Sequence, residues 1–208
     1  MRRALAVALL LTLAAPAAAS DTGLSGAEGH PRARFPLAVH LAPTDMVDEA
    51  SLSAAIRRAV ADWNALFAEA LGVQAFAWTE YQADAQVLVT LEPQQAGSRL
   101  MGEARVAVKD GVVVPPVRVA LYSGAQRGQT PRETLVYQIA AHELGHALGL
   151  EHVTDPRSIM CCVHGSVDFN DPVQRQAYIE ARQHPDLRSV KAQLEAHYRR
   201  FWRERSCS

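Results

Sequence analysis

The chain has 208 residues, of which 49% are hydrophobic and 21% are charged, and its formal net charge at pH 7 is −1. This near-neutral balance, with an isoelectric point of about 6.7, argues against nucleic acid as a partner. The length is typical of a single domain that can bury a substantial core.

The first 19 residues have the pattern of a secretory signal peptide. Arg2 and Arg3 precede an apolar run, and Ala17-Ala18-Ala19 supplies a small-residue cleavage site, so a cut after Ala19 is predicted. The apolar run falls short of the ~20 residues that a membrane span needs, which disfavours an uncleaved anchor. We therefore expect an exported bacterial protein, periplasmic or secreted, with no membrane contact after cleavage.

The rest of the chain is predicted to form one domain over residues 35–208, preceded by a polar, flexible arm over residues 20–34. Residues 35–41 alternate in the manner of a first strand. Between residues 51 and 71, apolar side chains recur at three- and four-residue steps, which predicts a helix with one buried face. Ser51 is a candidate cap for the start of this helix, and Gly72 is suited to follow its end.

Four further runs of branched and aromatic residues predict strands. They cover residues 75–81, 85–91, 104–109 and 112–121. Asp110-Gly111 is typical of a two-residue hairpin turn between the last two runs. Pro115-Pro116 is expected to break the ladder there, which leaves residues 117–122 as the fifth strand of the sheet.

A second helix is predicted to begin where Thr130, Pro131 and Glu133 form the pattern of a capping box. It leads into the stretch His142-Glu143-Leu144-Gly145-His146-Ala147-Leu148-Gly149-Leu150-Glu151-His152, which reads H-E-x-x-H-x-x-G-x-x-H. The bland interpretation of this stretch is an ordinary amphipathic helix with solvated histidines. The extended motif favours a metal site instead.

The spacing of this motif suits a catalytic zinc. His142 and His146 lie one turn apart on one helix face, so that both imidazoles can reach the same Zn²⁺. Gly149 can adopt the left-handed conformation that ends a helix, after which His152 returns as a third ligand. Three protein ligands leave one position open for water, and Glu143 is placed to accept a proton from that metal-bound water.

The stretch from His142 to His152 resembles the zinc site of the metzincin metalloproteases, most closely that of the matrixin branch. Ser158-Ile159-Met160 is similar to the turn that places a methionine beneath the zinc, and residues 76–85 resemble the matching matrixin segment. The resemblance implies an α+β, metzincin-like zincin fold. Such a fold has a twisted mixed five-stranded sheet, a long helix, a zinc-site helix and a helical C-terminal part, here at about residues 165–208.

The resemblance also implies peptide-bond hydrolysis with one catalytic Zn²⁺. In this scheme His142, His146 and His152 are the ligands, Glu143 is the general base and Met160 is the structural residue of the Met turn. Substrate would bind as an added strand along roughly residues 102–108.

Matrixins often bind a second zinc and calcium in the segment before the fifth strand. Here residues 92–111 contain no histidine and only three acidic residues. No structural zinc is therefore predicted, and Ca²⁺, although possible, has no supporting acidic loop. The short N-terminal arm contains no cysteine, so latency through a propeptide thiol is not expected.

The C-terminal part is predicted to contain a helix from Asp171-Pro172 to about residue 183 and another that starts at Asp186. Other candidate ligands in this part are expected to be surface or capping residues: His164, His184 and His197. Two candidate oxyanion donors, Tyr178 and Tyr198, are expected to be core or surface residues.

The chain has three cysteines, an odd count for an oxidising compartment. We expect Cys207 to pair with Cys161 or Cys162 and so to tie the last helix to the Met turn. Two alternatives stay open: all three thiols are reduced, or the spare cysteine binds the zinc.

These features together predict a secreted zinc endopeptidase, a monomer that acts on protein or peptide substrates. Two alternatives stay open: a zinc hydrolase of a small amide or cell-wall peptide, and a non-catalytic zinc-binding protein. The presence of Glu143 disfavours the second of these.

Overall fold

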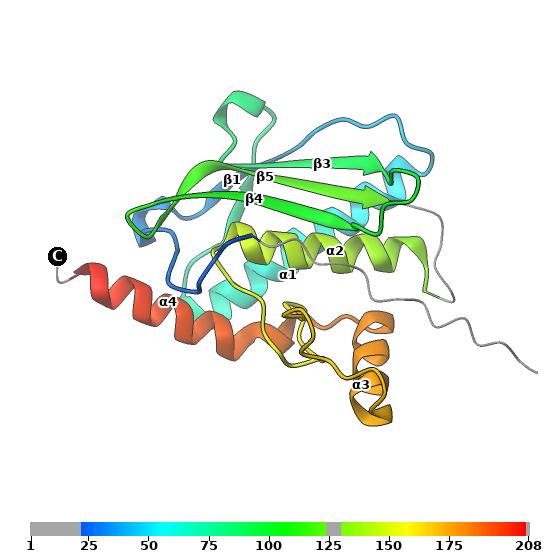
Figure 1. Ribbon diagram of the computed structural model, residues 1–208. Helices are drawn as coiled ribbons and strands as arrows, with labels where there is room; N and C mark the ends of the chain where they lie inside the picture. Colours follow the sequence, from blue (N-terminus) through cyan, green and yellow to red (C-terminus); the bar gives the residue numbers. More distant parts are fainter. Residues whose placement is uncertain (1–21, 124–129, 207–208) are drawn as a thin grey trace, which may run out of the picture.

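The computed structural model describes residues 22–123 and 130–206 (Figure 1). The predicted signal peptide and Cys207 lie outside the described residues. The structure is α+β, as expected, with a mixed five-stranded sheet in the order β2-β1-β3-β5-β4. Its strands are β1 (Leu37–Leu41), β2 (Phe76–Trp78), β3 (Val87–Pro93), β4 (Gly102–Lys109) and β5 (Val112–Ser123).

One strand runs against the others and lies at an edge. β1 pairs in parallel with β2 and β3, and β3 pairs in parallel with β5. β4 is antiparallel to β5, and no strand of residues 22–123 or 130–206 lies on its other side. Asp110 and Gly111, both with positive φ, form the tight turn of the predicted β4–β5 hairpin.

Two helices cover one face of the sheet, and a helical C-terminal part packs beyond them (Figure 1). α1 (Glu49–Leu71) and α2 (Arg132–Ala147) pack against each other, and α2 also contacts β4 and β5. α3 (Pro172–Gln183), the 3₁₀ turn η3 (Leu187–Val190) and α4 (Lys191–Ser206) follow. Two further 3₁₀ turns are η1 (Arg32–Arg34) and η2 (Gln82–Asp84).

The buried face predicted for α1 is confirmed. Leu52, Ile56, Trp63 and Phe67 are each fully buried in the core. Burial of one such side chain stabilises the fold by roughly 1.5–3 kcal/mol. Trp63 also donates from Nε1 to the Ala141 carbonyl over 2.9 Å, which fixes α1 against the turn of α2 that precedes His142.

The predicted starts of both long helices differ from the structure. α1 begins at Glu49 after Asp48, so Ser51 lies inside the helix. α2 begins at Arg132 after Pro131, without a side-chain cap. Ser51 and Glu133 instead meet each other, because the Ser51 hydroxyl donates to the Glu133 carboxylate over 2.9 Å. Two residues with capping propensity thus bridge the helices.

The ladder is interrupted at Pro115-Pro116, as expected, but the strand itself continues past the two prolines, which was not expected. β5 runs without interruption from Val112 to Ser123. Its pairing with β4 shifts register between Arg105 and Ala107, opposite the two prolines. A bulge of this kind tolerates residues that cannot donate to the ladder.

The N-terminal arm is packed where a loose segment was expected. The Gly29 amide donates to the Gly111 carbonyl, and Gly29 accepts from the Val113 amide over 3.0 Å. His30 is 1% exposed, and its Nε2 lies 2.9 Å from the Ala147 carbonyl at the end of α2. The arm therefore supports the helix that carries the zinc motif.

Candidate active site

α2 ends where the motif predicts. The Gly149 amide donates to the His146 carbonyl over 2.8 Å and the Leu150 amide donates to the Gly145 carbonyl over 3.0 Å. Gly149 has a φ of 87°, which favours glycine. A Cβ there would also lie 2.5 Å from the Glu28 carbonyl oxygen of the arm. This turn reverses the chain and returns His152 to the helix.

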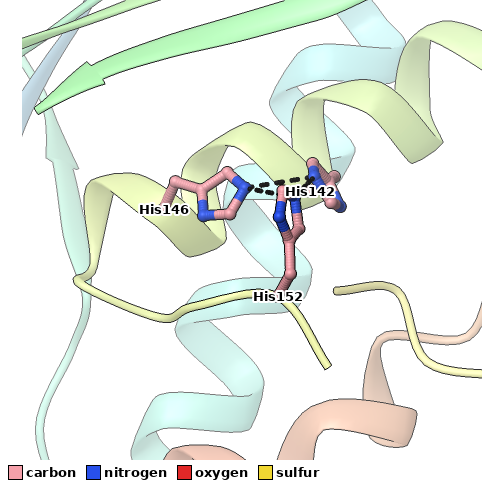
Figure 2. Close-up of side chains that lie close together, drawn as sticks. All are labelled: His142, His146 and His152. Atoms are coloured by element: carbon pink, nitrogen blue, oxygen red, sulfur yellow. Dashed lines mark hydrogen bonds between the residues drawn. The ribbon is translucent and has the colours of Figure 1, made fainter. Parts of the chain in front are cut away.

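Three imidazole rings converge at this point, two from α2 and one from the following loop (Figure 2). The Nε2 atoms of His142, His146 and His152 lie 3.1 Å apart in each pairing. Among the residues that the structure describes, no other group of three or more His, Cys, Asp or Glu side chains brings its ligand atoms this close together.

The hydrogen bonds of the Nδ1 atoms fix the tautomers of His142 and His146. His142 Nδ1 lies 2.8 Å from the Ile159 carbonyl, and His146 Nδ1 lies 2.7 Å from the Leu150 carbonyl. A carbonyl oxygen only accepts, so each Nδ1 carries the proton and each Nε2 presents a lone pair. Two lone pairs cannot hydrogen-bond to each other, and their convergence therefore suits a shared cation.

The distances and the protonation states both fit zinc. Ligand nitrogens bound at tetrahedral zinc are roughly 3.3–3.4 Å apart, close to the separation found here. Burial lowers the pKa of His142 to about 4. It lowers the pKa of His146 well below its usual value, as do the neighbouring His142 and His152. Neutral imidazole is the form that binds metal, so the group fits a catalytic zinc site.

Glu143 lies beside this group and is 3% exposed. Burial raises the pKa of its carboxyl group to about 8, the charge of Glu103 acts in the same direction, and a backbone hydrogen bond with Ala104 opposes them. Its Oε2 has no hydrogen-bond partner within the described part of the chain. A buried carboxylate oxygen without a partner is costly, and such groups mark candidate sites of proton transfer.

Gly102 allows β4 to approach this carboxylate, a role that the sequence motif did not reveal. A Cβ on Gly102 would lie 2.5 Å from Ile139 Cγ2 and 2.7 Å from Glu143 Oε1. Any larger residue there would require the Ile139 and Glu143 side chains to shift. The edge strand is therefore held directly over the acid.

Met160 lies against α2 where Gly145 faces it. It is fully buried, and a Cβ on Gly145 would lie 2.3 Å from its sulfur. The Val153 amide donates to the Met160 carbonyl over 3.1 Å, and the preceding Ile159 carbonyl holds His142. The turn thus contacts both ends of the motif.

The cysteine pairing differs from the expectation. The structure joins Cys161 to its neighbour Cys162 in a disulfide, whereas a bond to Cys207 was predicted. Adjacent cysteines need no long-range contact to pair, and sequence reasoning looked for a distant partner. Cys207 itself lies outside the described residues.

The remaining candidates are partly as predicted. Tyr198 is a core residue that donates to the Leu148 carbonyl over 2.6 Å. The ring of Tyr178 stacks under the Arg182 guanidinium. His164 and His184 are exposed. His197 was expected at the surface or at a cap, but it is 5% exposed and its Nδ1 lies 3.1 Å from the Gly26 carbonyl.

Comparison with known proteins assigns the family. Residues 37–173 match the matrixin peptidases, a span that includes the histidine group, Glu143 and Met160. This chain belongs to the matrixin family. It is also 51% identical over 37 residues to macrophage metalloelastase from Oryctolagus cuniculus. That alignment covers 18% of this chain and 8% of the relative.

The matrixin match ends near the start of α3. The rest of α3, η3 and α4 follow it, and α4 closes the core with Leu194, Tyr198 and Phe201. Among residues 22–123 and 130–206, every helix is too short or too polar to cross a bilayer.

Proposed function

We propose that this matrixin is a secreted zinc-dependent endopeptidase. The observation that carries the proposal is the convergence of the Nε2 atoms of His142, His146 and His152, 3.1 Å from one another, beside the buried acid Glu143. The alignment with macrophage metalloelastase covers 8% of that protein, so the activity of this chain is proposed from its own site and its family.

The three histidines would hold the zinc through Nε2. The carbonyls of Ile159 and Leu150 keep His142 and His146 in the required tautomer, and such supporting contacts tune metal affinity. A zinc ion held there supplies Lewis acidity, which polarises a peptide carbonyl and lowers the pKa of a water molecule.

Glu143 would transfer the proton during hydrolysis. A nearby cation favours the ionised carboxylate and so opposes the burial that raises the pKa of Glu143 to about 8. The ionised carboxylate that the cation favours is the form that can accept a proton. Glu143 would accept a proton from the attacking water and deliver it to the amine that leaves.

The substrate would bind as an extended strand along β4. β4 is an edge strand, and an edge offers unpaired backbone groups to another chain. Gly102 brings this edge next to Glu143. An antiparallel substrate strand along about residues 102–108 would therefore place a peptide bond near the carboxylate.

Other parts of the proposal concern where and with what the enzyme works. The signal pattern in residues 1–19 supports export to the periplasm or the medium. We propose a monomer that acts on proteins or peptides, with no nucleic acid and no membrane contact after cleavage.

The test uses the mature chain and two variants, Glu143→Gln and Glu180→Gln. Glu180 is exposed on α3 and serves as the matched control. We expect one zinc ion in each protein, cleavage of a diverse peptide library by the parent and the control, and loss of cleavage in Glu143→Gln or with a chelator. Zinc without cleavage by any of the three would favour a zinc-binding protein. Cleavage of small amides alone would favour a narrow hydrolase.

A further inference from the structure

A partly buried arginine on α3 contacts the loop that carries Met160, next to the zinc-site histidines. Arg182, near the C-terminal end of α3, donates from Nη1 to the Pro156 carbonyl over 3.4 Å and from Nη2 to the Cys161 carbonyl over 3.3 Å. Its guanidinium carbon lies 3.6 Å from the centre of the Tyr178 ring. Cys161 follows Met160, so Arg182 contacts the Met turn itself.

Within the described residues, the charge of Arg182 has no carboxylate partner. No carboxylate lies within ion-pair distance of this guanidinium in the part of the chain that the structure describes. Its positive charge is near enough to His142 to contribute to the lowered pKa of that histidine. A buried charge without a counter-ion is costly.

Arg182 also has donor capacity to spare. A guanidinium carries five N–H donors, and two of its contacts are long hydrogen bonds to backbone carbonyls. A carboxylate is the acceptor that a guanidinium binds most strongly, through two parallel bonds.

The direction of β4 shows which part of a substrate would lie on the side of α3. β5 points toward the side of the molecule where α3 lies (Figure 1), and β4 runs the opposite way from Gly102. A substrate antiparallel to β4 would enter at the β4–β5 hairpin and leave past Gly102. The residues after the scissile bond would therefore lie on the α3 side.

We propose that Arg182 binds a substrate carboxylate on the C-terminal side of the scissile bond. The substrates are accordingly peptides with Asp or Glu within the first two residues after the cut, or peptides that end there with a free carboxylate. This inference rests on the proposed peptidase function and adds the class of substrate. Arg182 lies beyond residues 37–173, which match the matrixins.

The experiment measures charge preference. A sequence that the mature chain cleaves is taken from the peptide library, and Glu is compared with Gln at each of the first two positions after the cut. A second pair ends two residues after the cut with a carboxylate or an amide, which separates a side-chain acid from a chain terminus. Binding of fluorescent versions to Glu143→Gln gives the same ratios without turnover.

Three substitutions at two arginines test the residue. The parent should prefer the acidic member of a pair by about tenfold or more in kcat/KM, since charged hydrogen bonds are the strong ones. Arg182→Gln should bring the ratio close to one, and Arg182→Lys should retain a smaller preference. Arg175→Gln is the control, because Arg175 lies on the same helix and also donates to a backbone carbonyl, that of Phe169.

Each outcome decides the proposal. If the parent uses both members of every pair equally, Glu and Gln as well as carboxylate and amide, the proposal is overturned and the peptidase function stays intact. An unchanged ratio in a folded Arg182→Lys or Arg182→Gln, or an equal loss of activity on every peptide, would show that Arg182 only supports the Met turn. Binding and cleavage of no peptide at all would overturn the proposed function, and this inference with it.

Discussion

Two groups of buried or half-buried histidines in this chain contain members with similarly lowered pKa values but have different geometry. His142, His146 and His152 meet below β4, whereas His30 and His197 lie where the N-terminal arm packs against α4 and the end of α2. Burial lowers the pKa of His30 to about 4, as it does that of His142. The lowered pKa therefore does not distinguish a metal site from a structural histidine.

The partners of the ring nitrogens make the distinction. His30 donates from Nε2 to the Ala147 carbonyl, and its Nδ1 lies 3.4 Å from an Arg34 nitrogen that can only donate. Both nitrogens of His30 are thus used within the protein. In the other group the Nδ1 atoms of His142 and His146 face carbonyls, and the Nε2 lone pairs converge. Lone pairs that converge identify the site for a cation.

The largest expected difference between the two groups is catalytic. Glu143→Gln removes the group that transfers the proton, and kcat should fall about 10²- to 10⁴-fold. His30→Gln keeps a donor toward the Ala147 carbonyl and should retain the activity of the parent per folded molecule. Peptide cleavage at saturating substrate measures both. Equal losses in the two variants would remove the functional contrast between the groups.

Zinc should stabilise the fold through one histidine group alone. A ligand that binds only the folded state at about 1,000 times its Kd raises the free energy of unfolding by ~4 kcal/mol. Thermal unfolding with zinc or with a chelator should show this shift in the parent and in His30→Gln, and little shift in His152→Ala. A full shift in His152→Ala would place the stabilising zinc elsewhere.

Acid should destabilise the fold through His30, in the second histidine group. The folded chain keeps His30 neutral down to about pH 4, whereas the unfolded chain protonates it near 6.5. The unfolded state then binds more protons between these values, so stability falls as the pH decreases through this window, by up to ~3 kcal/mol from His30. Urea unfolding at about pH 7 and about pH 4.5 should show a smaller loss in His30→Gln. An equal loss in the parent and the variant would mean that His30 does not contribute.

The motif spacing predicted much of the site because the chemistry is local. His142 and His146 are one turn apart on a helix, and Gly149 ends that helix, so residue types at fixed offsets imply a meeting of side chains. The buried face of α1 and the Asp110-Gly111 turn were predictable for the same reason. Each depends on neighbours in the sequence.

The features that were missed depend on contacts between distant segments. Gly102 is needed because Ile139 and Glu143 approach β4, and nothing near Gly102 in the sequence indicates this. Ser51 and Glu133 were assigned to separate caps and instead bond to each other across two helices. His30 lies in a polar stretch that suggested a loose arm, and its burial depends on α2 and α4.

The most direct test of the account is the zinc content of three proteins: the mature parent, His146→Ala and His30→Gln. After dialysis against a trace of zinc, mass spectrometry of the metal should find one zinc ion per chain in the parent and in His30→Gln, and almost none in His146→Ala. X-ray absorption of the parent should show nitrogen ligands at about 2.0–2.1 Å. A folded His146→Ala that keeps its zinc, or a parent that binds none, would contradict the central claim that the converging histidines form the metal site.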